Sequence, residues 1–307
     1  MCMNPTRAAT VIAAMAMLTL ATSAAAWPFG GSAQSAAKSN SVPAAAQPQA
    51  PAPAPTKPTP AGDAKPSNVK ATPQERAAAE RLDPVARVGF WTREASLDPQ
   101  DAEAGLALAQ SLRVLGRNSE AVDAANQVLA VHPNLQAALI ELARAEVSAN
   151  RGFYAIRPLK LAAAANPRDW WPWMLLGVAY AQNEQPDLAR SAYEEALHLA
   201  PNSPQALSNY ALFRATHGEP QAAEAMLRKA VAAPGSAAPE RQNLALVLGL
   251  QGKISEAELL IRQDLPPELA DANLAYLRSL NAKAEPAPGR SWNAVQASEA
   301  AQIKAPS

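Results

Sequence analysis

Side chains that could catalyse a reaction or ligate a metal are few in this sequence. The chain has three histidines, His132, His198 and His217, and one cysteine, Cys2. Zinc sites draw on several closely spaced Cys, His or carboxylate ligands, and three scattered histidines without a second cysteine do not supply them. The glycine-rich phosphate loops, the HExxH metal motif and the GxSxG nucleophile motif are also absent from the sequence. We therefore expect no catalytic residue, no metal and no cofactor.

Side chains that could bind another polypeptide are more numerous than catalytic or metal-binding ones. An Asn side chain can both donate to and accept from a peptide backbone, while Trp and Met offer apolar contact area. We expect such residues to line a groove that binds an extended peptide or a partner helix, with these candidates: Trp171, Met174, Gln182, Gln205, Asn209, Leu212, Gln242 and Asn243. The alternative is that Trp170 and Trp171 close a junction between repeats and that the Asn side chains are solvated.

Composition excludes several classes of partner. The 307 residues include 27 Lys and Arg and 27 Asp and Glu, so the net charge is zero. A balanced charge gives no electrostatic reason to expect nucleic acid or an anionic membrane as a partner. Hydrophobic residues make up 49% of the chain but aromatic residues only 5%. Because alanine favours helices and lets them pack closely, we expect an all-α fold with a core of small side chains.

The elements that must position the candidate groove recur with a fixed period. Pro99, Pro133, Pro167 and Pro201 are each 34 residues apart, and one further step reaches Gly235 beside Pro234. A period of this length indicates a repeat architecture. Each repeat is expected to be a pair of helices, with the proline ending the second helix because it has no N–H group to continue it.

The repeat resembles the tetratricopeptide repeat (TPR), whose pattern is W-x2-L-G-x2-Y, then A-x3-F, then P. Residues 170–203 follow this pattern closely, with Trp173, Leu176, Gly177, Tyr180, Ala189, Tyr193, Ala196 and Pro201 in register. Small residues at the eighth and twentieth positions are expected where the two helices of a repeat touch. The resemblance implies a right-handed superhelix of about five helix-turn-helix repeats, with the first helix of each repeat lining the concave side.

Elements at both ends of the repeats complete the expected solenoid. Residues 73–97 read as an additional helix pair, with Pro84 opening its second helix and with Phe90 and Trp91 packing on the first repeat. Pro266 to Leu280 is expected to be a capping helix with an apolar stripe of Leu269, Leu274 and Leu277. Within the repeats, the residues expected to cap the second helices are Ser119, Asp187 and Ser255.

The chain begins with features of a secretory signal. Arg7 precedes the apolar run from Ala8 to Ala21, and Ala24 and Ala26 offer a cleavage site before Trp27. An uncleaved membrane anchor is the alternative, although the run is short for a spanning helix. Eight prolines between residues 41 and 66 then predict an extended spacer. A cleaved signal implies a periplasmic protein.

These observations divide the chain into four parts. We expect a signal peptide at 1–26, an Ala/Pro-rich disordered linker at 27–72, a TPR domain at 73–280 and a disordered tail at 281–307. Trp292 lies alone in that tail, where it is a docking anchor, makes a fold-back contact or has no role.

The C-terminal part carries a more specific resemblance. "APERQNLALVLGLQGKISEAELLIRQDLPPELADANLAYLRSL", residues 238–280, and the tail motif "SWNAVQ" are similar to TadD-type proteins of the alphaproteobacterial tight-adherence (Flp) pilus system. This resemblance implies a periplasmic scaffold that binds pilus assembly components, with the outer-membrane secretin as one candidate. Many members of that family are lipoproteins, whereas no lipobox cysteine follows the apolar run here.

Two other functions remain open at this point. One is a general periplasmic TPR adaptor for envelope or cytochrome biogenesis. The other is an enzyme that uses the repeats to recruit substrates, but no stretch of the hundred or more residues that a catalytic domain needs is left over. We accordingly expect a non-enzymatic scaffold with protein partners, no nucleic acid and no small-molecule substrate. The oligomeric state does not follow from the sequence.

Overall fold

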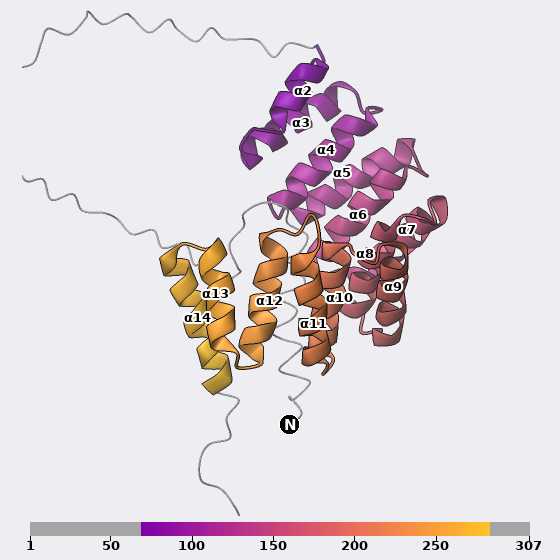
Figure 1. Ribbon diagram of the computed structural model, residues 1–307. Helices are drawn as coiled ribbons and strands as arrows, with labels where there is room; N and C mark the ends of the chain where they lie inside the picture. Colours follow the sequence, from indigo (N-terminus) through magenta and orange to yellow (C-terminus); the bar gives the residue numbers. More distant parts are fainter. Residues whose placement is uncertain (1–68, 283–307) are drawn as a thin grey trace, which may run out of the picture.

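The computed structural model describes residues 69–282, and all of its regular elements in this range are α-helices. Ten of them pair into five hairpins. The hairpins stack along a curved path (Figure 1). We call the first helix of each hairpin an A helix and the second a B helix. The A helices are α4 (Ala102–Val114), α6 (Gln136–Ser148), α8 (Trp170–Gln182), α10 (Pro204–Thr216) and α12 (Ala238–Leu250). The B helices are α5 (Asn118–Val131), α7 (Gly152–Ala165), α9 (Pro186–Leu199), α11 (Pro220–Ala232) and α13 (Ile254–Asp264). The expected all-α solenoid is confirmed.

The 34-residue period of the sequence is the period of the structure. Successive A helices begin 34 residues apart, from Ala102 to Ala238, and so do successive B helices. Each B helix that precedes one of the periodic prolines ends two residues before it, as α9 does at Leu199 before Pro201. Proline cannot supply the N–H group that another helical turn would need.

Small side chains allow the two helices of each hairpin to approach closely, as the sequence predicts. The residues at the eighth and twentieth positions are all buried: Ala109, Ala143, Gly177, Ala211 and Ala245 in the A helices, and Ala121, Ala155, Ala189, Ala223 and Ala257 in the B helices. Larger side chains fill the space beside them, including Leu159, Leu227 and Ile261, each at most 1% exposed. The buried side chains form four clusters that follow one another along the stacked helices.

The turn inside each hairpin depends on backbone conformation. The fifteenth residue of every repeat has a positive φ: Gly116, Asn150, Glu184, Gly218 and Gly252. The next residue donates its N–H to the carbonyl five residues earlier, as Arg117 does to Leu112 at 2.9 Å, in the geometry of a Schellman motif.

The expectation that side chains cap the B helices is wrong. The caps of α5, α9 and α13 are Arg117, Gln185 and Lys253, and none makes a side-chain capping bond. Ser119, Asp187 and Ser255 are instead the second residues of their helices. The Schellman turn leads the chain directly into the B helix, so the observed cap lies two residues before the predicted one.

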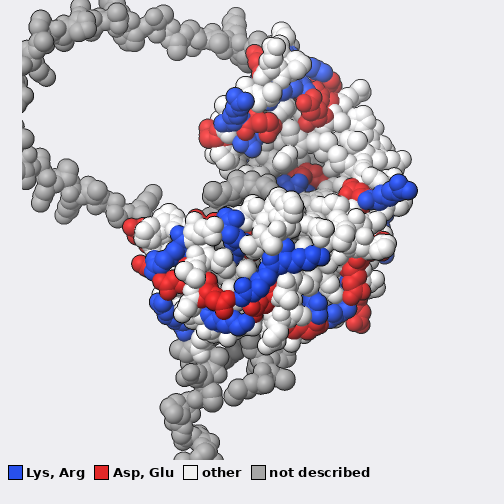
Figure 2. All heavy atoms as spheres, in the orientation of Figure 1, with Lys and Arg blue, Asp and Glu red and all other residues white. Residues whose placement is uncertain are grey.

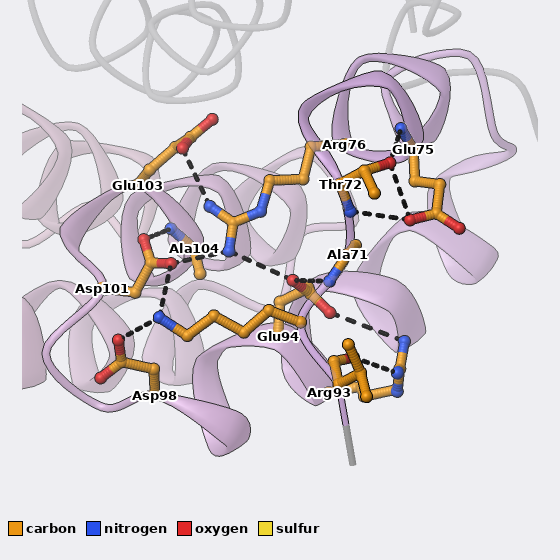
Figure 3. A network of polar contacts seen from close by, with 12 residues as sticks. Ala71, Thr72, Glu75, Arg76, Arg93, Glu94, Asp98, Asp101, Glu103 and Ala104 are labelled. Atoms are coloured by element: carbon orange, nitrogen blue, oxygen red, sulfur yellow. Dashed lines mark hydrogen bonds and ion pairs between the residues drawn. The ribbon is translucent and has the colours of Figure 1, made fainter. Parts of the chain in front are cut away.

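An additional helix pair, α2 (Pro73–Ala79) and α3 (Pro84–Leu97), precedes the hairpins as expected. Trp91 is 2% exposed and packs against Ala104 of α4, and Phe90 joins the same cluster. A polar clasp holds the pair in place (Figure 3). Arg76 donates to Asp101 at 2.6 Å and to Glu94 at 3.1 Å, and the backbone N–H of Ala71 donates to Glu94 at 3.0 Å.

The final helix, α14 (Pro267–Ala282), covers the last hairpin. Leu274 and Leu277 are buried in the core with α12 and α13, as predicted. Leu269 is 40% exposed, however, and Ala270 is buried in its place, so the predicted apolar stripe is wrong at this position. The helical repeat brings 270, 274 and 277 to one face, and residue 269 lies to the side of it.

Charged residues lie mostly on the surface, where positive and negative side chains are interspersed. Figure 2 shows Lys and Arg beside Asp and Glu over the visible face, with no extended field of one sign. This agrees with the zero net charge. The predicted signal peptide with Ala24 and Ala26, most of the linker, and the tail with Trp292 lie outside the described residues.

Candidate partner-binding surface

Successive A helices contact one another along the solenoid, α4 with α6, α6 with α8, and so on to α12. We define the inner surface as the second, fifth, sixth, ninth and thirteenth positions of the A helices. These positions include all eight residues that the sequence predicts for the groove. The repeat therefore brings residues that are 34 apart in sequence into one row across neighbouring helices.

The predicted groove residues differ widely in exposure. Gln205 is exposed, whereas Trp171, Gln182 and Gln242 are half-buried. Met174 and Leu212 are buried at 1% and 9% exposure, so their side chains contribute to packing between helices. Gln182 donates to the carbonyl of Val147 at 3.0 Å and so ties α8 to α6. A partner role for these side chains remains a prediction, and Gln205 is the most accessible of them.

Asn209 and Asn243 are both buried and both hydrogen-bonded. Asn243 Nδ2 donates to Ser208 Oγ at 2.9 Å, which joins α12 to α10. Asn209 Nδ2 donates to the carbonyl of Gln205 at 2.9 Å, one turn earlier in α10. In this conformation Asn243 holds two A helices in register, and contact of either Asn with a partner backbone stays a prediction.

A cluster of charged residues on α4 and α6, which reaches Trp171 of α8, was missed by the sequence analysis. Arg113 Nε donates to Glu141 at 2.6 Å, and Arg144 Nη1 donates to the other oxygen of Glu141 at 3.2 Å. The Arg144 guanidinium lies 5.8 Å from the centroid of the Trp171 ring. Burial lowers the pKa of Arg144, while the Glu141 carboxylate opposes that shift. Glu141 and Arg144 occupy the sixth and ninth positions, so the same register rule applied to the second repeat would have found them.

The cluster makes Trp171 part of a fixed structure. Its indole packs edge-to-face on Trp170, with ring centroids 5.0 Å apart, and it also contacts the Arg144 cation and the hydrophobic core. Aromatic and cation–π contacts of this kind favour one orientation of a ring. These contacts fix the orientation of the half-buried indole of Trp171 at the second position of α8.

The His, Asp and Glu side chains of the described residues do not form a cluster that could bind a metal ion. Within residues 69–282 no group of three or more His, Cys, Asp or Glu side chains is placed to hold a metal ion. His198 and His217 are exposed, and the His132 ring bonds the carbonyl of Gln100 at 3.1 Å in a neighbouring turn. In the same range, no helix combines the length and the apolar character that crossing a membrane requires.

Comparison with known proteins identifies the repeat. The tetratricopeptide repeat family profile matches residues 170–213, which comprise α8, α9 and most of α10. This segment includes the repeat with the nearest match to the sequence pattern. No curated protein matches the chain.

Solved structures with the same arrangement come from diverse proteins. A thermophilic TPR protein of Thermus thermophilus is 25% identical, with a TM-score of 0.50 over 57% of this chain and 94% of that one. A TPR protein from Parabacteroides merdae is 14% identical, with a TM-score of 0.51 over 67% and 85% of the two chains. A structure of the APC/C hetero-tetramer Cut9–Hcn1 gives 16% identity and a TM-score of 0.52, over 69% and 49%.

The similarity to these solved structures and the five in-phase hairpins indicate the same fold. The described part of the chain has the fold of a tetratricopeptide repeat solenoid, and residues 170–213 match the profile of the tetratricopeptide repeat.

Proposed function

We propose that this protein is a non-enzymatic periplasmic scaffold that supports assembly of the Flp pilus secretion machinery. It binds a protein partner on the inner surface. The observation that carries the proposal is the alignment of five A helices at a constant 34-residue spacing, which repeats equivalent side chains at regular intervals. A regular row of this kind suits a ligand that is itself extended and regular, such as a polypeptide.

The character of the inner surface favours a protein over a charged polymer. In α8, α10 and α12 the five inner positions hold no charged residue, and they combine apolar side chains with amides such as Gln205 and Gln242. Amides satisfy the donors and acceptors of a peptide backbone, and apolar side chains give contact area. Nucleic acid would instead require clustered Lys and Arg.

The assignment to the pilus system rests on two features of the sequence. One is the similarity of residues 238–280 to TadD-type proteins, and the other is the signal-like N-terminus that would direct the chain to the periplasm. Residues 238–280, which carry this similarity, lie in the last hairpin and its capping helix. A general TPR adaptor for envelope or cytochrome biogenesis would use the same surface and remains the second candidate.

A deletion strain tests the proposed function. We expect loss of surface pili and of secretin multimers, with both restored by the wild-type gene. Periplasmic extracts should contain the protein, and it should co-purify with the secretin or with inner-membrane pilus components. Normal pili in the deletion strain would contradict the proposal, and loss of cytochromes with normal pili would favour the second candidate.

A further inference from the structure

The outer surface of α7 carries an unusual group of exposed apolar side chains. Phe153, Tyr154 and Leu161 are 66%, 62% and 47% exposed. The two rings pack edge-to-face with their centroids 5.5 Å apart. Beside them is an open cavity of about 750 Å³, whose floor is apolar and includes Leu139 and Leu142 of α6. We call this group of residues the α7 patch.

The repeat itself shows that the fold does not require these residues. At the position of Phe153 the other four repeats carry only polar residues, all exposed: Ser119, Asp187, Gln221 and Ser255. At the position of Leu161 they carry Gln127, Glu195, Lys229 and Gln263. Because the same place in the same fold is polar in every other hairpin, packing does not explain Phe153 and Leu161. Exposed apolar groups of this kind mark interaction sites.

The patch is also basic. Arg157 and Lys160 are exposed on α7, α7 contains no Asp or Glu, and neither cation forms an ion pair with any residue in the range 69–282. Most Arg side chains elsewhere on this surface have a carboxylate partner, as Arg228 has in Glu256 at 2.6 Å. At the position of Arg157 the first repeat carries Asp123, and at the position of Lys160 the third repeat carries Glu194. The patch thus has a local positive charge that the protein does not neutralise.

A proline inside α7 adds a polar group to the patch. Pro158 lies at the middle of the helix and has no N–H group. The carbonyl of Tyr154, four residues earlier, therefore lacks the N–H donor that any other residue at position 158 would supply.

We propose that the α7 patch is a second docking site, separate from the inner surface, for a segment of another protein with apolar side chains flanked by Asp or Glu. The apolar anchors would enter the cavity beside Phe153 and Leu161, and the carboxylates would pair with Arg157 and Lys160. The site uses none of the inner positions of the A helices, so the inner surface stays free and the solenoid joins two proteins.

Charge argues against the other possible occupants. Residues 1–68 carry four basic residues and one acidic residue, and residues 283–307 carry three and two, so neither end of the chain complements a basic patch. A second copy docked patch to patch would place Arg157 and Lys160 against themselves. An anionic membrane would attract the charges, but a concave apolar floor fits inserted side chains better than a flat lipid surface.

The test uses the full chain and two labelled 18-residue amphipathic peptides, one with Leu and Phe on one face and Glu on the other, and a twin with Lys in place of Glu. The acidic peptide should bind, and F153S/L161Q and R157D/K160E should each weaken binding at least tenfold. These variants insert residues found at the same positions of other repeats, so the fold is kept. R157D/K160E should now prefer the Lys twin.

Three controls separate this site from others. L259Q removes a side chain of α13 that is 74% exposed, R81E reverses a distant exposed charge, and Q205R alters the inner surface. All three should bind the acidic peptide within twofold of wild type. Equal binding of the two peptides, unchanged binding by the α7 variants, or no binding of the acidic peptide would overturn the proposal. The proposal would also be overturned if the protein bound phosphatidylglycerol vesicles but not the acidic peptide, and if F153S/L161Q abolished the binding to vesicles.

Discussion

The ring of Tyr193 in α9 lies directly against the Cα atom of Gly177 in α8. A Cβ atom at residue 177 would be 2.6 Å from Tyr193 Cδ1, closer than side chains pack. Tyr193 is 3% exposed, and burial raises the pKa of its hydroxyl. The same ring stacks on Tyr210 of α10, with centroids 5.3 Å apart. Gly177 therefore admits a large ring that closes the third hairpin and also forms its junction with the fourth.

Gly177→Ala should destabilise the solenoid by about 1–3 kcal/mol, because the ring must move to admit the new methyl group. The free energy of unfolding in urea measures this. The second repeat holds Ala143 and Leu159 at these two positions, so G177A/Y193L copies a natural pair. The double variant should lose less stability than the sum of G177A and Y193L. Additive losses would show that the close approach is not what constrains residue 177.

Glu184 occupies a position that favours glycine. Its φ is 55°, and three of the five equivalent residues are Gly. Glu184→Gly should stabilise the protein by about 1 kcal/mol, because a left-handed conformation costs an L-residue roughly that much. Gly116→Ala is the matched reverse change. A Cβ there meets nothing within 4 Å, so only the φ of 74° should destabilise the variant. A shift of the urea midpoint in the same direction for both would contradict this explanation.

The clasp at the N-terminal helix pair should respond to acid. The hydrogen bond from Arg76 holds the pKa of Asp101 below its usual value. A lowered folded-state pKa stabilises the protein above the unfolded value, near pH 4, and this stability is lost as the pH falls through the folded value. D101N keeps a good helix cap and removes the charge.

Wild type should therefore be more stable than D101N from pH 7 to pH 5, and the difference should shrink below about pH 4. Urea unfolding at a series of pH values checks this. A difference that stays constant down to pH 3 would show that the charge of Asp101 does not stabilise the clasp.

Much of this fold could be predicted from the sequence because the repeat is local and periodic. Pro133, Pro167 and Pro201 fix the period, and the small residues at the eighth and twentieth positions fix which faces meet. The failures have physical causes. The B-helix caps were misplaced because the backbone of a Schellman turn leads into the helix without a side-chain cap, both after Gly116 and Gly252 and after Glu184.

The candidate site was harder to predict than the fold. Side-chain pairs such as Asn243 with Ser208 depend on how two A helices align, which a pattern within one repeat does not reveal. The α7 patch was missed for a different reason. Phe153 and Leu161 were not compared with the polar residues at the same positions of the other repeats, and that comparison would have indicated that both side chains are exposed.

Asn243 and Gln205 should separate a structural role from a binding role on the inner surface. Asn243→Ala leaves the buried Ser208 hydroxyl without its partner and should cost about 1–3 kcal/mol of stability. Gln205→Ala, at an exposed position, should change stability by less than about 0.5 kcal/mol and weaken partner binding. Thermal unfolding and co-purification measure the two effects. Normal stability of N243A would show that its hydrogen bond does not hold α12 to α10.

The central claim, that the inner surface holds a protein partner, is tested most directly by photo-crosslinking in cells. A photoreactive residue would be placed at Gln205 or Gln242 on the inner surface and at Gln221 or Gln263 on the outer surface of α11 and α13. We predict adducts with a pilus assembly protein from the inner positions and few or none from the outer ones. Adducts from the outer positions alone would contradict the account.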